Sequence, residues 1–213
     1  MILINFKNYK TGKDALKLAR LIEKYLPKAV VAVPAPDIEG VSKNTKLKVY
    51  AQHVDYLGDK KGTGFITAES IKRDGAEGTI LNHSEHPIQF EILRKTIENC
   101  KKNKLKTLVC VRDLTEAKIV MRWKPDAIAF EEPSLIATGK SITEYRTKEL
   151  EEFVKLIKRT KIIPLCGAGI STIEDVKAAY AMGCGGVLIA SAIANAKHPE
   201  EFLRELQDIT IKE

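Results

Sequence analysis

Short apolar runs alternate with amphipathic stretches along the whole chain. Each run holds five or six residues, most of them apolar, and the stretch that follows it repeats apolar residues every three or four positions. The first pattern predicts buried β-strands, and the second predicts helices that cover them. The expected strands are residues 2–6, 30–34, 47–51, 78–82, 106–111, 126–130, 161–166 and 185–190. The expected helices are residues 13–26, 37–44, a stretch from about 67, 87–102, 113–123, 144–159, 172–182 and 199–207.

The number and order of these units predict the fold class. Eight successive strand–helix units favour an α/β protein in which eight parallel strands close into a (β/α)8 barrel surrounded by helices. The alternative is an open doubly wound sheet, which often begins with a Gly-rich turn, but the first turn here reads Asn-Phe-Lys-Asn-Tyr. No linker or composition shift divides the chain, so we expect residues 1–213 to form a single barrel domain.

Side chains alternate along a strand, and this alternation assigns directions to the polar residues at the strand ends. In the first strand Asn5 and Lys7 point into the barrel mouth. In the sixth strand Glu131 shares the inward face of Ala127 and Ala129, whereas Glu132 points outward. Active-site residues of such barrels lie at the C-terminal ends of the strands. The residues also fit a plainer interpretation, in which Lys7 is a solvated lysine and the two glutamates are a solvated acidic pair.

The fourth strand ends in Leu-Asn-His-Ser-Glu-His-Pro at 81–87. We expect His83 to point into the mouth with a helix beginning directly behind it, whose positive end would disfavour the imidazolium form. A neutral imidazole there could donate a hydrogen bond to a substrate oxygen. In the alternative, Ser84 caps that helix and His83 is an incidental residue of the rim.

The last two strands are followed by turns rich in small residues. They read Cys-Gly-Ala-Gly-Ile-Ser-Thr at 166–172 and Leu-Ile-Ala-Ser-Ala-Ile-Ala at 188–194. Bare backbone N–H groups in such turns bind anions, and many barrels hold a phosphate group there. The pattern predicts a phosphorylated ligand without defining the reaction.

Charge and composition narrow the class of partner. The net charge is +7, and its densest basic run is Lys-Lys-Asn-Lys-Leu-Lys at 101–106. No aromatic residues interleave with this run, so we interpret it as a solvated surface rather than a nucleic-acid site. No apolar stretch is long enough to predict a membrane span. The four cysteines and four histidines lack metal-ligand spacing, so we expect reduced thiols, no metal and a cytoplasmic protein.

Short motifs along the chain stand in the order found in triosephosphate isomerases, and the chain most resembles the shorter archaeal form of that family. Each motif alone is a weak signal, but the ordered set from residue 4 to residue 191 is specific. The motifs are Ile-Asn-Phe-Lys (4–7), Ala-Gln-His-Val-Asp (51–55), Thr-Gly (63–64), Leu-Asn-His-Ser-Glu (81–85), Ala-Phe-Glu (129–131), Ala-Thr-Gly (137–139) and the two turns at 166–172 and 188–191.

The resemblance implies an isomerase that interconverts glyceraldehyde 3-phosphate and dihydroxyacetone phosphate without a cofactor or a metal. It makes Glu131 the general base that moves a proton between two substrate carbons, and His83 the neutral electrophile that polarises the carbonyl. Lys7 would supply positive charge to the enediolate and the phosphate, with Asn5 hydrogen-bonding nearby. Glu85 matches the glutamate that follows the family's histidine.

The resemblance also implies a lid, a phosphate site and an oligomer. Thr63 resembles the residue that reaches into the neighbouring subunit, so a homodimer or homotetramer is expected. The lid would be Pro133, Ser134, Leu135, Ile136, Ala137 and Thr138. Phosphate would be bound by Asn5, Lys7 and backbone N–H groups of Ile136, Ala137, Gly169, Ala190 and Ser191.

The chain departs from the family pattern around the lid. Glu132 stands where proline usually follows the catalytic glutamate, and Ala137 stands where the lid usually has glycine. Alanine allows fewer backbone conformations than glycine, so we expect these changes to affect lid movement more than the type of reaction. His86 and Pro87 also replace residues that are commonly arginine in the family.

Two other functions fit parts of the sequence. A phosphate-binding barrel with a different reaction, such as a synthase or another sugar-phosphate isomerase, would keep the two turns but would not need Lys7, His83 and Glu131. A non-enzymatic barrel that binds nucleic acid is supported only by the net charge and Glu132. We therefore expect a triose phosphate as the substrate, and neither nucleic acid nor membrane as a partner.

Overall fold

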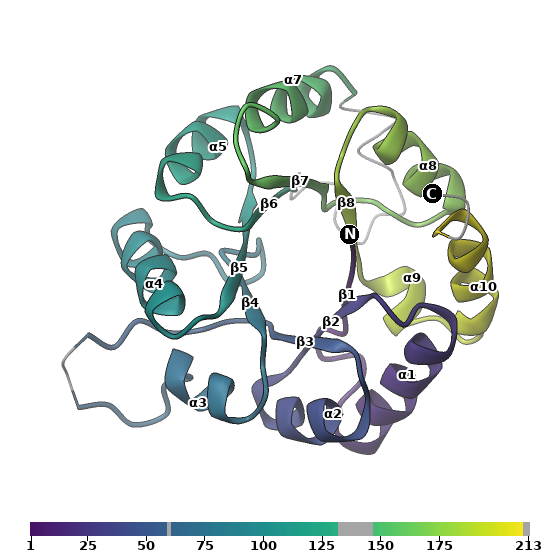
Figure 1. Ribbon diagram of the computed structural model, residues 1–213, viewed down its shortest axis with the longest axis horizontal. Helices are drawn as coiled ribbons and strands as arrows, with labels where there is room; N and C mark the ends of the chain where they lie inside the picture. The colour runs from purple at the N-terminus through teal and green to yellow at the C-terminus, as the bar shows by residue number, and fades with distance from the viewer. Residues whose placement is uncertain (59–60, 132–146, 211–213) are drawn as a thin grey trace.

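Eight parallel strands form a closed ring in the computed structural model, which describes residues 1–58, 61–131 and 147–210. Each strand pairs with the next along the chain, and β8 pairs with β1 to close the barrel (Figure 1). The expected fold class is confirmed. The strands are β1 (Ile2–Asn5), β2 (Val30–Val33), β3 (Lys48–Ala51), β4 (Gly78–Leu81), β5 (Lys106–Val111), β6 (Ala127–Phe130), β7 (Ile163–Cys166) and β8 (Gly186–Ile189).

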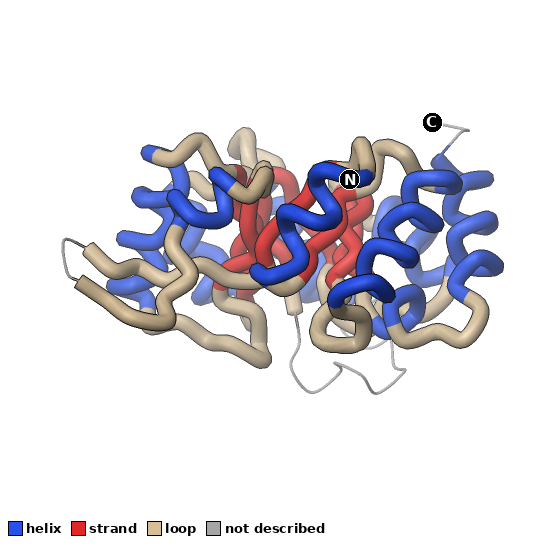
Figure 2. Tube along the Cα trace, turned by 90° about the horizontal axis from the view of Figure 1, so that it is seen from below, coloured by secondary structure: helices blue, strands red, loops and turns tan. Residues whose placement is uncertain are grey.

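Helices surround this ring and cover its outer face (Figures 1 and 2). The α-helices are α1 (Gly12–Tyr25), α2 (Ile38–Asn44), α3 (Ala68–Arg73), α4 (Phe90–Lys102), α5 (Leu114–Val120), α7 (Thr147–Ile157), α8 (Ile173–Ala181), α9 (Ser191–Ala194) and α10 (Pro199–Thr210). Two short 3-10 helices, η1 (Ala35–Asp37) and η2 (Met121–Trp123), complete the described elements.

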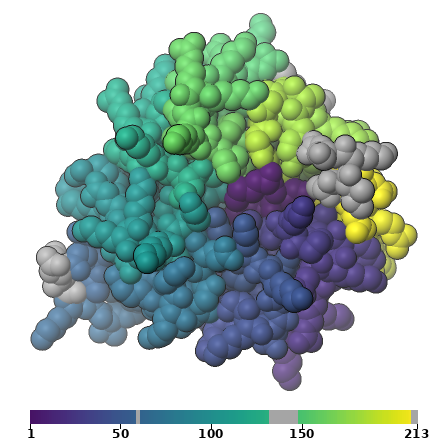
Figure 3. Space-filling model, viewed as in Figure 1, coloured from purple at the N-terminus to yellow at the C-terminus, as the bar shows by residue number. Residues whose placement is uncertain are grey.

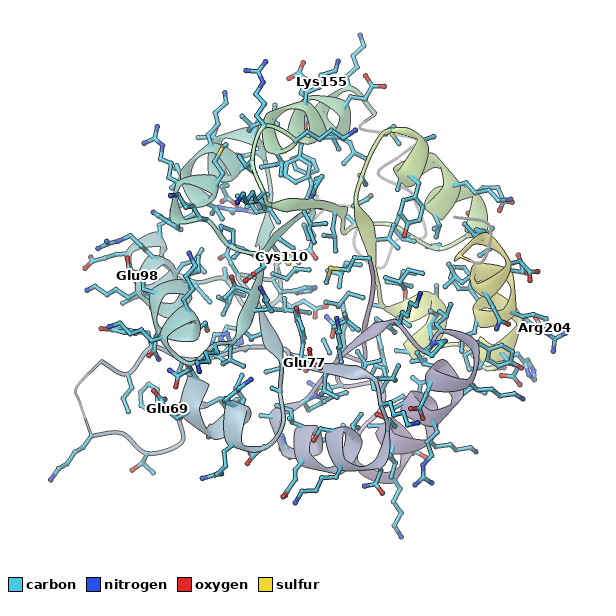
Figure 4. All side chains as sticks on the ribbon, in the orientation of Figure 1. Glu69, Glu77, Glu98, Cys110, Lys155 and Arg204 are labelled. Atoms are coloured by element: carbon cyan, nitrogen blue, oxygen red, sulfur yellow. The ribbon has the colours of Figure 1, made fainter. Side chains whose placement is uncertain are left out.

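The amphipathic pattern explains how each helix is oriented. In α1 the buried residues Ala15, Leu18, Ala19 and Ile22 follow the three- and four-residue spacing of one helix face. Charged residues occupy the opposite faces of the helices. Figure 4 shows Glu69, Glu98, Lys155 and Arg204 on the outer side of the ring, whereas Cys110 lies inside the barrel.

Strand alternation divides the core into two layers, as the sequence predicted. One cluster fills the barrel interior and includes Leu3, Ala127 and Ala129. The other lies between the strands and the helices and includes Ile4 and Phe130. The inward face of β6 therefore leads directly to Glu131, which is 1% exposed.

The observed elements differ from the expected ones in the lengths of the strands and in one additional helix. The strands are mostly one or two residues shorter than the apolar runs, because only the paired part of each run belongs to the ring. The short helix α9 begins directly after β8, ahead of the helix that was expected at 199–207. No helix in the described part of the chain is both long enough and apolar enough to span a bilayer.

Candidate active site

The end of β1 holds Lys7 in a constrained backbone conformation. Lys7 has a φ of 45°, a left-handed conformation that is uncommon for residues other than glycine. The Asn5 side-chain oxygen accepts a hydrogen bond from the Lys7 N–H at 2.9 Å, and Gln52 Nε2 donates to the Lys7 carbonyl at 2.9 Å. Gln52 Nε2 also donates to Asn5 Oδ1 at 3.2 Å. These bonds stabilise a strained turn of the kind that gathers at functional sites.

Glu85 connects Lys7 with His83. The Lys7 ammonium lies 2.6 Å from Glu85 Oε1. The backbone N–H of Glu85 donates a hydrogen bond to His83 Nδ1 at 3.1 Å. A ring nitrogen that accepts a hydrogen bond carries no proton, so His83 is neutral in this arrangement and its proton lies on Nε2.

The helix expected directly behind His83 is not there. The next helix, α4, begins at Phe90, and its N-cap is Gln89 rather than Ser84, so the helix-end explanation and its alternative are both wrong. A turn closed by the His86 N–H and the His83 carbonyl at 2.8 Å occupies this position. Pro87 disfavours a helical conformation at His86, and Asn82 Oδ1 accepts a bond from the Ile88 N–H at 2.9 Å. The neutral form of His83 therefore depends on Glu85.

Glu131 follows β6 and faces His83 across the mouth. Its Oε1 atom lies 3.8 Å from His83 Nε2. Neither carboxylate oxygen of Glu131 has a hydrogen-bond partner among the described residues. Burial raises the pKa of Glu131, whereas the neighbouring His83, the Cys110 thiol, the Ser84 backbone and Lys7 act in the opposite direction and lower it. A carboxylate without water or hydrogen bonds is a stronger base than one in solution.

Gly167 forms part of the wall around Glu131, and the sequence analysis did not identify this role. A Cβ atom at Gly167 would lie 2.8 Å from Glu131 Cγ and 3.2 Å from Glu131 Oε1. Glycine is therefore needed so that the carboxylate can fit beside the end of β7. In the sequence Gly167 is only a glycine at the end of a strand, and its contact with Glu131 exists because β6 and β7 are neighbours in the barrel.

Small residues end β7 and β8, as predicted, and these neighbouring strands place their turns side by side. Gly169 has a φ of 65°. Asp175 Oδ2 accepts hydrogen bonds from the Ser171 and Thr172 N–H groups, both at 2.9 Å. The Gly169 N–H has no hydrogen-bond partner among the described residues. After β8, Ala190 precedes the first turn of α9, which begins at Ser191.

A cavity of about 580 Å³ opens at the ends of β1 to β4 and is lined by Asn5, Lys7, His83 and Glu85, whereas Glu131 and the turns after β7 and β8 do not line it. It also contacts His53 and His86, whose rings stack with centroids 3.9 Å apart, and the sequence analysis gave neither residue a site role. Thr63 is exposed in the loop between β3 and α3, which projects from the ring (Figure 1), so it does not join the cavity. The proposed lid, Pro133–Thr138, lies outside the described residues together with Glu132.

The chemistry of this mouth is that of proton transfer next to a carbonyl group. A buried carboxylate faces a neutral imidazole, and an ammonium group lies beside the imidazole, while the turns after β7 and β8 carry backbone N–H groups that suit an anion. In residues 1–58, 61–131 and 147–210 no three His, Cys, Asp or Glu side chains are grouped to hold a metal ion. Fold and site together define an eight-stranded parallel barrel whose mouth has groups suited to proton transfer and to anion binding.

Comparison with known proteins identifies the family. The family model for triosephosphate isomerase matches residues 1–207. The triosephosphate isomerase of Methanocaldococcus jannaschii is 38% identical and the alignment covers 97% of this chain and 98% of that protein. The enzyme of Sulfolobus acidocaldarius is 36% identical over 100% of this chain and 95% of its own length. The chain belongs to the triosephosphate isomerase family, and its sequence is of the archaeal type.

A solved structure supports the fold. The crystal structure of triosephosphate isomerase from Bartonella henselae matches with a TM-score of 0.74 and 22% sequence identity, and the match covers 99% of this chain and 98% of that one. The chain is therefore an aldose–ketose isomerase that interconverts glyceraldehyde 3-phosphate and dihydroxyacetone phosphate. The comparisons do not favour a barrel with another reaction or a nucleic-acid-binding barrel.

Proposed function

We propose that Glu131 is the general base of this isomerase and that Glu132 takes no part in the proton transfer. The position of the Glu131 carboxylate supports this assignment, because it is buried, lies 3.8 Å from His83 Nε2 and has no hydrogen-bond partner among the described residues. The raised pKa of Glu131, which burial causes, brings its basicity closer to what proton abstraction from carbon requires.

In the proposed reaction the Glu131 carboxylate takes a proton from the hydroxyl-bearing carbon beside the substrate carbonyl. The electron pair of the broken C–H bond forms the carbon–carbon double bond of the enediolate, and the carbonyl oxygen becomes an oxyanion. The proton of the hydroxyl group then passes to the former carbonyl oxygen, and the protonated Glu131 returns its own proton to the neighbouring carbon. The former hydroxyl oxygen thereby becomes the carbonyl oxygen of the other triose phosphate. No electrons are gained or lost overall.

His83 and Lys7 stabilise the oxyanion in this proposal. The His83 ring is neutral, so its Nε2–H can donate a hydrogen bond to the developing charge, and the Lys7 ammonium adds a positive charge nearby. Groups that are already in place before the reaction stabilise a developing charge without a further cost of reorientation. Asn5 contributes by fixing the Lys7 backbone.

Glu85 acts as a positioning residue through two separate contacts. Its backbone N–H sets the protonation state of His83, and its carboxylate holds the Lys7 ammonium at 2.6 Å. The carboxylate is 57% exposed, whereas the Lys7 side chain is 11% exposed. Glu85 therefore orients a mostly buried cation from the solvent side.

The phosphate group of the substrate is proposed to bind the backbone N–H groups of Gly169, Ala190 and Ser191. The Gly169 N–H, which has no hydrogen-bond partner in the described part of the chain, and the adjacent ends of β7 and β8 support this placement. Ile136, Ala137 and the lid Pro133–Thr138 belong to the same proposal from the sequence alone. A closed lid would exclude water from the base and the enediolate.

The chain is further proposed to act as one barrel domain in a cytoplasmic homodimer or homotetramer. The strand ring supports a single domain because it uses elements from Ile2 to Ile189. Four buried free cysteines fit a reducing compartment. The projecting loop that carries Thr63 also exposes Phe65, which is 50% exposed and suits a subunit contact.

Substitution of the two adjacent glutamates tests the assignment of the base. Purified Glu131→Gln and Glu132→Gln variants are compared in a coupled assay with glyceraldehyde 3-phosphate. We expect Glu131→Gln to lower kcat by about 10³-fold, as the loss of a general base does, while Glu132→Gln leaves kcat within about threefold. Equal losses in the two variants, or a greater loss in Glu132→Gln, would rule out Glu131 as the base.

A further inference from the structure

The barrel has a second cavity at the end opposite the active site. This basal cavity has a volume of about 1050 Å³ and lies where the strands begin. Its apolar wall includes Val30, Leu108 and Ala127 from the starts or interiors of β2, β5 and β6. Figure 3 views the molecule from this end, with the start of the chain in purple near the centre of the face. The catalytic residues lie at the other ends of the strands.

The rim of the basal cavity is strongly basic. Six cationic side chains line it, against the two carboxylates of Glu77 and Asp126. Asp126 is already paired, because the Lys106 ammonium lies 2.7 Å from its Oδ1 atom and the Thr107 N–H donates to its Oδ2 atom at 2.9 Å. The other five cations are Lys28, Lys48, Lys124, Arg159 and Lys161.

None of these five side chains makes a hydrogen bond or an ion pair with another residue in the described part of the chain. They belong to different β/α units, since Lys28 precedes β2, Lys48 begins β3, Lys124 precedes β6, and Arg159 and Lys161 precede β7. The closed ring brings them to one opening although they are far apart in sequence. Like charges around a cavity with low-dielectric walls focus a positive potential inside it.

Tyr50 adds a hydrogen-bond donor on the floor of the basal cavity. The residue is 6% exposed, and its hydroxyl has no hydrogen-bond partner among the described residues. Burial raises the pKa of Tyr50, and the charges of Asp126 and Glu77 raise it further. The hydroxyl therefore stays protonated and can donate to an anion that enters from the basic rim.

We propose that the basal cavity binds a small anion that carries several phosphate groups. The rim cations are exposed and flexible, and a single exposed ion pair is weak. A ligand with one phosphate group would engage too few of them, whereas a chain of phosphate groups engages several at once and gains the advantage of multivalent binding. The volume also exceeds what a single phosphate group would fill.

Inorganic tripolyphosphate is the probe for this site, titrated calorimetrically into the full-length protein. A saturating concentration of phosphoglycolate, a two-carbon analogue of the substrate, blocks the active site. We expect one tripolyphosphate to bind per chain, with an affinity that decreases as salt increases, and orthophosphate to bind at least tenfold more weakly. The Lys48→Gln/Lys161→Gln double variant removes cations from two sides of the rim and should weaken tripolyphosphate binding at least tenfold.

A second double variant controls for the total charge. Lys13→Gln/Lys177→Gln removes two exposed cations of α1 and α8 that do not line the basal cavity, and tripolyphosphate should bind it within twofold of the unmodified chain. Isomerase activity should be unchanged in both variants. Equal weakening in both variants would overturn the proposal, as would displacement of tripolyphosphate by phosphoglycolate or the absence of binding to the unmodified chain.

Discussion

Glu131 occupies a position that packing alone would fill with an apolar residue. It continues the inward face of β6 beyond Ala127 and Ala129, and its carboxylate oxygens have no partner among the described residues. A buried, unpaired carboxylate destabilises a fold because it loses its hydration without gaining a hydrogen bond. The same environment strengthens the carboxylate as a base. Glu131 therefore lowers the stability of the fold and is a stronger base than a solvated glutamate.

The burial of this carboxylate predicts that Glu131→Gln changes the stability of the fold in a pH-dependent way. Burial raises the pKa of Glu131, so the folded chain keeps the proton at pH values where the unfolded chain has lost it. Below the ordinary carboxyl pKa both states are protonated, and as the pH rises through the raised pKa the folded state must carry a buried charge and becomes less stable. Glu131→Gln should be more stable by about 1–3 kcal/mol at pH 7.

Urea unfolding at two pH values measures this effect. The gain in the unfolding free energy of Glu131→Gln should disappear near about pH 4, where the native glutamate is also neutral. A gain of the same size at both pH values would show that the charge of Glu131 is not its cause. A loss of stability at pH 7 would contradict the proposed environment of the carboxylate.

Gly167 gives a second prediction at the residue scale. Alanine at this position would place a Cβ atom 2.8 Å from Glu131 Cγ, so the carboxylate must move. Small displacements of a catalytic group are costly, and we expect kcat to fall by about 10- to 100-fold in steady-state assays. Gly40→Ala is the matched control, because nothing lies within 4 Å of a Cβ atom at Gly40. Equal activity of the two variants would contradict the role of Gly167.

The sequence predicted part of this site, and the limits have physical causes. Alternation along β6 was enough to point Glu131 inward, because a strand has a fixed period of two. The surroundings of His83 were predicted wrongly, since a helix was expected where Pro87 and the Asn82 side chain impose a turn. The role of Gly167 depends on a contact between neighbouring strands, which no local pattern along the sequence contains.

At the scale of elements, α8 illustrates how a helix start is fixed beside the phosphate turn. Thr172 Oγ1 accepts a hydrogen bond from the Asp175 N–H, and Asp175 reaches back to the Thr172 N–H, which forms a capping box. Thr172→Ala should lower the unfolding free energy by about 1 kcal/mol in urea titrations. Thr11→Ala is the control, because Thr11 caps α1 without a side-chain hydrogen bond. A loss of the same size in both variants would contradict this role of the capping box.

The elements themselves were the most predictable level of the structure. The apolar run 106–111 predicted the bounds of β5 correctly, because strands that are buried on both faces need a continuous apolar sequence. The helix α4 was expected to begin at Pro87, three residues before its observed start. Proline is favourable at a helix start, but the His83 carbonyl and the Asn82 side chain accept hydrogen bonds from the His86 and Ile88 N–H groups and hold this segment in a turn. The helix α9 has only four residues, which is too short for a helical period to be recognised in the sequence.

The whole molecule separates two kinds of chemistry at the two ends of one barrel. The C-terminal ends of the strands hold Glu131, His83 and Lys7, and the N-terminal ends hold the basal cavity. Because the barrel interior between them is filled by apolar side chains such as Leu3, Ile80 and Leu165, a ligand at one end does not contact a ligand at the other. The two sites can therefore be tested independently.

The projecting loop gives a prediction about assembly. Phe65 is 50% exposed in the loop that carries Thr63, and an exposed aromatic side chain on a projecting loop suits a subunit contact. Under the proposed assembly, sedimentation velocity experiments should give an oligomer for the unmodified chain and a species shifted toward monomer for Phe65→Asp. Ile163→Asp is the control, because Ile163 is 38% exposed in the basal cavity, away from this loop. An unchanged oligomer in Phe65→Asp would contradict assembly through the loop.

Hydrogen exchange at the substrate tests the central proposal, proton transfer by Glu131, most directly. Dihydroxyacetone phosphate is incubated with the enzyme in D₂O, and NMR follows the entry of deuterium at the hydroxyl-bearing carbon beside the carbonyl. The unmodified chain should catalyse this exchange, and Glu131→Gln should slow it by about 10³-fold, while Glu132→Gln should exchange at nearly the unmodified rate. Exchange by Glu131→Gln at the unmodified rate would show that another group removes the proton.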